Sequence, residues 1–223
     1  MPETILVEVA PSDRTTALLY AAPASIAKGV TLILGHGAGA PQRSAFMATF
    51  ANELAQRGIE TVTFNFLYTE HKRRLPDRND RLEQCYRAVI DTVRERGAGR
   101  LAIGGKSMGG RIASQVAANS PLDLAGLVFF GYPLHPPGKP EQLRSRHLPA
   151  IRAPMLFIQG SRDAFGTPDE LRPILHELAA PTELFEIEGG DHSFKVTKAS
   201  PIPQQHVFPM ILDYTAQWLQ RLA

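Results

Sequence analysis

The sequence has a single cysteine, Cys85. One cysteine excludes an intramolecular disulfide and a zinc site built on several cysteines. Leu82, Val89 and Ile90 surround it at helical spacing, so we expect Cys85 to be a small buried hydrophobic residue. The sequence also lacks His-Glu-x-x-His and comparable clusters of metal ligands. We therefore expect neither a metal nor another cofactor.

Long hydrophobic runs and a strong charge of one sign are missing as well. No apolar run approaches the roughly 20 residues that a membrane-spanning helix needs, and residues 1–4 do not begin a secretory signal. The formal net charge is +2, too small to indicate a nucleic-acid partner. We expect a cytoplasmic protein with no membrane or nucleic-acid partner, and the oligomeric state stays open.

What the chain does contain is a regular alternation of short apolar strands and helices. This alternation predicts one α/β domain over residues 1–223, with a twisted, mostly parallel sheet of about seven to eight strands and helices on both faces. The predicted strands are Ile5–Val9 and Ala17–Tyr20 (a leading hairpin), Val30–Leu34, Ile59–Phe64, Arg100–Gly104, Leu124–Phe130, Pro154–Gln159 and Glu183–Glu188. The predicted helices are Ser44–Arg57, Asp80–Arg96, Met108–Asn119, Pro168–Ala179 and Gln204–Leu222.

Ligands of such sheets bind beyond the carboxyl ends of the strands, so we expect the functional residues in the turns that follow the strands. The turn at residues 104–110, Gly-Gly-Lys-Ser-Met-Gly-Gly, contains Gly-x-Ser-x-Gly between a predicted strand and a predicted helix. A nucleophilic serine needs a tight turn of this kind, and the flanking glycines let neighbouring backbone pass closely. We predict Ser107 as the nucleophile and the Met108 amide as an oxyanion donor.

The same turn also resembles the end of a phosphate-binding P-loop. That motif needs a glycine at position 100, which is Arg100, and a loop where this chain has a predicted strand. The nucleotide-binding interpretation therefore fails.

A second glycine-rich turn follows the strand Val30–Leu34. Its sequence, His36-Gly37-Ala38-Gly39, is the His-Gly-x-Gly pattern that supplies a second oxyanion amide in serine hydrolases. We predict the Ala38 amide as that donor, with Gly37 as the next candidate. His36 either contacts the substrate or braces the loop by a backbone hydrogen bond.

The acid and the base are predicted from the chain order of such hydrolases: serine, acid, histidine, each after a successive strand. Asp163 follows the strand that ends at Gln159, and His192 follows the strand that ends at Glu188. His192 would remove the proton from Ser107, and Asp163 would orient the imidazole. Asp191 and Asp169 are alternative acids, with loop capping and helix N-terminal charge as their simpler roles.

Together these residues resemble the small α/β-hydrolases of the dienelactone-hydrolase-like branch. More narrowly, the chain is similar to the "testis-expressed" hydrolase-like group, which includes a subunit of a non-specific-lethal chromatin complex. The resemblance implies a minimal hydrolase core with its triad at Ser107, Asp163 and His192. Dienelactone hydrolases proper use a cysteine nucleophile, so lactone opening is not implied. The matching segments are 35–39, 64–68, 73–77, 131–140, 159–163 and 191–194.

Three features bear on the substrate. The segment 131–153 is short and rich in proline, with room for one helix around Gln142–His147, so we expect a minimal lid or none. The basic run at 71–78 is either a solvated loop held by Asp77 or a site where Arg73 or Arg74 binds an anionic substrate group. Tyr132, in the segment after a strand, is a further substrate-binding candidate.

The pattern favours a serine hydrolase that cleaves a carboxylic ester or thioester of a small soluble substrate. An acyltransferase or a perhydrolase would use the same residues. The alternatives are a non-catalytic interaction module on a hydrolase fold and, with less support, a peptidase, which usually needs a larger cap.

Overall fold

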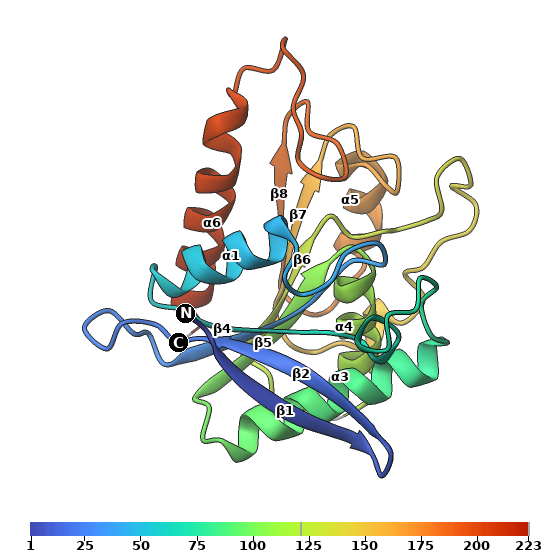
Figure 1. Ribbon diagram of the computed structural model, residues 1–223. Helices are drawn as coiled ribbons and strands as arrows, with labels where there is room; N and C mark the ends of the chain where they lie inside the picture. Colours follow the sequence, from blue (N-terminus) through green and yellow to red (C-terminus); the bar gives the residue numbers. More distant parts are fainter. Residues whose placement is uncertain (121, 223) are drawn as a thin grey trace.

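The computed structural model describes residues 1–120 and 122–222. In this part of the chain eight strands form one sheet in the order β1-β2-β4-β3-β5-β6-β7-β8 (Figure 1). The strands from β3 onward run parallel, whereas β1 and β2 pair antiparallel at one edge. The bounds are β1 Glu3–Ala10, β2 Asp13–Tyr20, β3 Val30–Gly35, β4 Glu60–Phe64, β5 Arg100–Lys106, β6 Gly126–Phe130, β7 Met155–Gly160 and β8 Thr182–Ile187.

Helices cover both faces of the sheet (Figure 1). Helices α1 and α6 lie on one face, and α3, α4 and α5 lie on the other. The bounds are α1 Ala45–Ala55, α2 Leu67–Glu70, α3 Asn79–Glu95, α4 Met108–Asn119, α5 Pro168–His176 and α6 Gln204–Gln220, with a 3-10 turn at Leu148–Ala150. No described helix is long and apolar enough to cross a membrane.

The two cores follow from the alternation of side chains along each strand. In β3 every residue is buried: Leu32 and Leu34 pack with α1 and α6, whereas Ile33 packs with α3 and α4. Successive side chains of a strand point to opposite faces, so a strand covered on both faces is apolar throughout. Cys85 is fully buried in α3, as its neighbours predict.

The predicted elements all occur, and most differ from the structure by a few residues at their ends. The hairpin strands are longer than predicted, because polar residues beyond the predicted ends also pair across the hairpin. Helix α5 ends at His176 and not at Ala179.

The sequence leaves room for one helix around Gln142–His147, and the structure has none there. Residues 142–145 are irregular, 146–147 form a turn, and the 3-10 turn follows directly after them. Two hydrogen bonds tie the backbone of Arg144 to the core: its N–H donates to the Leu134 carbonyl at 2.7 Å, and its carbonyl accepts from the Tyr132 hydroxyl at 3.0 Å. These contacts hold the segment in an irregular path, and no large lid covers the sheet edge below it.

Candidate active site

Ser107 lies in the sharp turn between β5 and α4, at the carboxyl edge of the sheet. Its backbone is left-handed, with φ 51° and ψ −116°, a conformation that non-glycine residues rarely adopt. The Ser107 N–H donates to the Phe130 carbonyl at 3.1 Å, which fixes the turn against β6. The strained turn projects the hydroxyl away from the strand and into a cleft.

The glycines around this turn are required by close packing between α4 and β3. A Cβ on Gly109 would lie 2.1 Å from the Gly35 carbonyl oxygen, and a Cβ on Gly105 would lie 2.3 Å from the same atom. No side chain fits at either position without moving backbone. The glycines therefore let α4 start directly beside the end of β3.

The structure brings Ser107, His192 and Asp163 into one hydrogen-bonded chain. His192 Nδ1 lies 2.7 Å from Asp163 Oδ2, and His192 Nε2 lies 2.8 Å from Ser107 Oγ. Because the carboxylate accepts a hydrogen bond from Nδ1–H, a neutral imidazole presents Nε2 as the acceptor for the serine hydroxyl. The three residues come from the turns after β5, β7 and β8.

Asp163 is 1% exposed and is held by groups that the sequence did not reveal. The Gln159 side-chain amide donates to Asp163 Oδ2 at 2.9 Å, and the Phe165 backbone N–H donates to Oδ1 at 2.8 Å. Gln159 is itself fully buried, and its amide oxygen accepts from the Tyr132 N–H at 2.8 Å. The carboxylate is thereby aimed at His192.

The two alternative acids take the simpler roles considered for them. Asp191 Oδ1 accepts from the backbone N–H groups of Ser193 at 2.8 Å and Lys195 at 2.9 Å, so it caps the loop that carries the histidine. Asp169 is 94% exposed in the first turn of α5, beside Arg172.

The loop after β3 lies beside the serine. A Cβ on Gly37 would be 3.8 Å from Ser107 Cβ, and the Tyr68 hydroxyl donates to the Ala38 carbonyl at 2.8 Å. Met108 opens α4, so its N–H has no acceptor within the helix. Gly37, Ala38 and Met108 all line the cleft together with Ser107.

His36 is completely buried and braces this loop. Its Nδ1 donates to the Gly37 carbonyl at 2.7 Å, and its Nε2 accepts from the Phe66 N–H at 3.2 Å. Burial lowers its pKa to about 4, so the ring is neutral at pH 7. His36 is not among the described residues that line the cleft, which favours the bracing role over contact with the substrate.

Lys106 is a further residue of the site that the sequence did not single out. Its ammonium group donates to the His192 carbonyl and lies 5.4 Å from the centre of the Phe194 ring. Burial lowers the pKa of Lys106 to about 8. Phe165 also contacts the histidine, with its ring centre 4.3 Å from that of His192.

The cleft around Ser107 has a volume of about 770 Å³. Its lining is largely apolar and comes from α1, α3, α4, α6 and the turn after β7. It also carries the basic residues Arg111, on α4, and Arg144, in the segment after β6. The principal apolar lining residues are Phe46, Met47, Leu82, Met108, Phe165 and Phe208.

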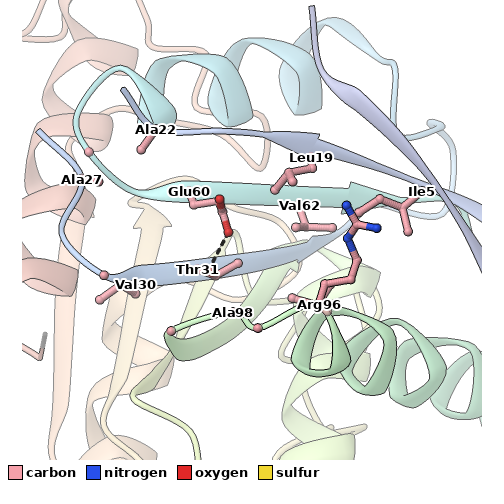
Figure 2. A pocket seen from close by; sticks show the side chains of 15 residues that line it. Ile5, Leu19, Ala22, Ala27, Val30, Thr31, Glu60, Val62, Arg96 and Ala98 are labelled. Atoms are coloured by element: carbon pink, nitrogen blue, oxygen red, sulfur yellow. Dashed lines mark hydrogen bonds between the residues drawn. The ribbon is translucent and has the colours of Figure 1, made fainter. Parts of the chain in front are cut away.

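A second cavity, of about 300 Å³, lies at the opposite edge of the sheet (Figure 2). Val30, Glu60 and Gly99 line it at the amino ends of three parallel strands, and Thr31 donates to the Glu60 carboxylate at 2.9 Å. Ligands of parallel sheets bind at the carboxyl ends. The larger cleft is therefore the candidate active site.

The remaining substrate-binding candidates lie outside this cleft. Arg73 is exposed and pairs with Asp77 at 2.8 Å, Arg74 is also exposed, and Tyr132 is completely buried. None of the three is among the described lining residues. The contact of Arg73 with Asp77 favours the interpretation of the basic run as a solvated loop held by Asp77. Tyr132 packs beneath the segment after β6.

The structure contains a second serine–histidine hydrogen bond. Ser114 Oγ lies 2.7 Å from His147 Nε2, and the Ser114 hydroxyl donates to the Arg111 carbonyl at 2.7 Å. Ser114 is completely buried, and neither residue is among the described lining residues of the cleft. This pair fastens the segment after β6 to α4.

Comparison with known proteins places this arrangement in a family. Residues 28–220 match the alpha/beta hydrolase domain. The chain belongs to that family. The described part of this hydrolase contains no group of three or more histidine, cysteine or acidic side chains placed to hold a metal ion.

Solved structures show the same fold. A dienelactone hydrolase from Anabaena variabilis is 21% identical, with a TM-score of 0.76 over 99% of this chain and 97% of its own. A lidless α/β serine hydrolase from Xanthomonas campestris is 21% identical, with a TM-score of 0.73 over 99% and 93%. An esterase domain from Rhodothermus marinus is 13% identical, with a TM-score of 0.74 over 100% of both chains. The chain has the α/β-hydrolase fold without a large lid.

Proposed function

We propose that this protein is a serine hydrolase that cleaves a carboxylic ester or thioester of a small soluble substrate. The observation that carries the proposal is the hydrogen-bonded chain from Ser107 through His192 to Asp163, which opens on the cleft. The family and the esterase among the similar structures support a hydrolase. The proposal includes no cofactor and no nucleic-acid or membrane partner.

In the proposed mechanism His192 Nε2 takes the proton of Ser107 as Oγ bonds to the substrate carbonyl carbon. The resulting oxyanion accepts from the Met108 N–H and from the Ala38 or Gly37 N–H. Asp163 stabilises the imidazolium, which then protonates the leaving alcohol or thiol as its bond to carbon breaks. Water attacks the acyl-enzyme with His192 as the base and releases the acid.

The cleft fits a small or extended soluble substrate better than a lipid surface. In the described residues no large lid covers it, and its lining includes both apolar and basic residues. If an alcohol or peroxide replaced water in the second step, the same residues would perform acyl transfer or perhydrolysis. We also propose, from the resemblance of segments 64–68 and 131–140, that the chain belongs to the "testis-expressed" hydrolase-like group.

The proposal is tested with p-nitrophenyl esters from acetate to octanoate. We expect wild-type turnover with a preferred chain length and loss of turnover in Ser107→Ala. Ser114→Ala, which removes the hydroxyl of the other serine–histidine pair, should keep the activity. Folded wild-type protein that hydrolyses none of the esters would instead favour a non-catalytic interaction module.

A further inference from the structure

Two arginines enter the candidate active site from different elements. Arg111 follows Ser107 by four residues, so its side chain lies one helical turn farther along α4 on the same face. The Arg111 N–H donates to the Ser107 carbonyl at 3.1 Å. Arg144 comes from the segment after β6, whose irregular path places it at the cleft.

Neither guanidinium group has an acidic partner within 4.0 Å in the described residues. Arg111 donates to the neutral side chains of Asn79 at 3.3 Å and Gln115 at 3.2 Å. Burial and the positive charge of Arg144 both lower the pKa of Arg111. Two like charges thus line the same partly buried cleft, which costs free energy unless an anion joins them.

The other charged groups of the cleft do not neutralise this pair. Asp77 is the one carboxylate among the described lining residues, and Arg73 binds it at 2.8 Å. Lys106 also lines the cleft, and its ammonium group is engaged with the His192 carbonyl. The cleft therefore has an excess of positive charge in its lining.

We propose that Arg111 and Arg144 bind an anionic oxygen group of the substrate, a carboxylate or a phosphate, while its ester carbonyl lies at Ser107. This inference rests on the proposed hydrolase function. Guanidinium groups suit such anions because they donate parallel hydrogen bonds and stay charged. The apolar lining residues Phe46, Met47 and Phe208 would hold the hydrocarbon part of the substrate.

The test compares two esters that differ in one charge. Mono-4-nitrophenyl adipate carries a free carboxylate, and methyl 4-nitrophenyl adipate is its neutral match. We expect kcat/KM to favour the acid by about 10-fold or more, since a charge-assisted contact has that strength. Mono-4-nitrophenyl esters of longer diacids, up to sebacate, vary the distance between the ester carbonyl at Ser107 and the carboxylate at the arginines.

The variants Arg144→Gln and Arg111→Gln should each lower kcat/KM for the acid by about 10- to 100-fold, mainly through KM. The neutral ester should change little. Arg146→Gln is the matched control, because Arg146 is exposed and is not among the described residues of the cleft. If Arg111→Gln does not fold, Arg144→Gln decides alone. Equal effects on both esters would overturn the proposal.

Binding separates this inference from the hydrolase function itself. Ser107→Ala is titrated with monomethyl adipate, butyl phosphate and dimethyl adipate. Tighter binding of the carboxylate or of the phosphate than of the neutral diester, lost in Arg144→Gln, supports the anion site and identifies the anion even if no ester is hydrolysed. Equal binding of all three overturns the anion site and leaves the hydrolase proposal standing.

Discussion

Gln159 ties the candidate acid to the core of the molecule. Its side-chain amide donates to Asp163 at 2.9 Å and to the Gly166 carbonyl at 2.6 Å, and its oxygen accepts from the Tyr132 N–H. A buried amide with all these partners has one orientation. The orientation of Asp163, and through it of His192, follows from that of Gln159.

Gln159→Leu should therefore lower kcat by about 10-fold or more, because a hydrogen bond to a charged group is lost. KM should change little, since Gln159 is buried below the cleft and the proposed role is to position Asp163. Steady-state kinetics on a p-nitrophenyl ester measures both parameters. Gln84→Leu is the control, because Gln84 lies on α3, contacts the Val9 carbonyl of β1 and is not among the described lining residues of the cleft. A change in KM alone would contradict the positioning role.

The sequence could identify Ser107, Asp163 and His192 because each lies in a short pattern directly after a strand. It could not identify Gln159 or Lys106 in the same way. The contact of Lys106 with the His192 carbonyl joins residues 86 positions apart, and no local spacing encodes it. For the same reason the sequence points to Arg73 and Arg74 and does not reveal Arg111 and Arg144: a basic run is visible in the sequence, whereas a pair assembled from two elements is not.

At the scale of elements, the site depends on how closely α4 approaches β3. In an ordinary helix, alanine in place of glycine is favourable by about 1 kcal/mol. At Gly109 the added Cβ would lie 2.1 Å from the Gly35 carbonyl oxygen. Alanine in place of Gly109 should therefore destabilise the protein.

We expect Gly109→Ala to lower the free energy of unfolding by about 1–3 kcal/mol, as overpacking does. Chemical denaturation measures this value. At Gly39 a Cβ would meet no atom within 4 Å, so Gly39→Ala should leave the stability unchanged. Stabilisation by Gly109→Ala would mean that α4 does not start against β3.

The sequence did not reveal the structure of two segments. Helix α2, Leu67–Glu70, is too short for a periodic pattern to reveal. The segment 142–147 is long enough for a short helix, yet contacts of Arg144 with Leu134 and Tyr132 hold it in an irregular path. The long helices were found because their buried residues recur at helical spacing, and such periodicity survives without knowledge of tertiary contacts.

At the scale of the whole molecule, buried histidines link folding to pH. Burial lowers the pKa of His36 and of His147 to about 4, from a usual value of 6.5. Unfolding exposes both rings, so between pH 6.5 and 4 the unfolded chain binds protons that the folded protein does not. The free energy of unfolding therefore falls as pH decreases through this window. For His36 the loss is up to about 3 kcal/mol.

Urea unfolding at several pH values from 7 to 4.5 measures this loss. His147→Gln can keep a hydrogen bond to Ser114 but cannot bind the proton, so its stability should fall less steeply than that of the wild type. His206→Gln removes an exposed histidine and should behave like the wild type. Equal slopes for all three proteins would show that His147 does not contribute.

The central claim is that Ser107 is a nucleophile activated by His192, and covalent labelling tests it most directly. A fluorophosphonate reacts with an activated serine, and peptide mass mapping identifies the residue that carries the label. We predict one label, on Ser107, in the wild type, and a greatly slowed reaction in His192→Ala. No label on Ser107 of the folded protein, or a label on Ser114 in its place, would contradict the account.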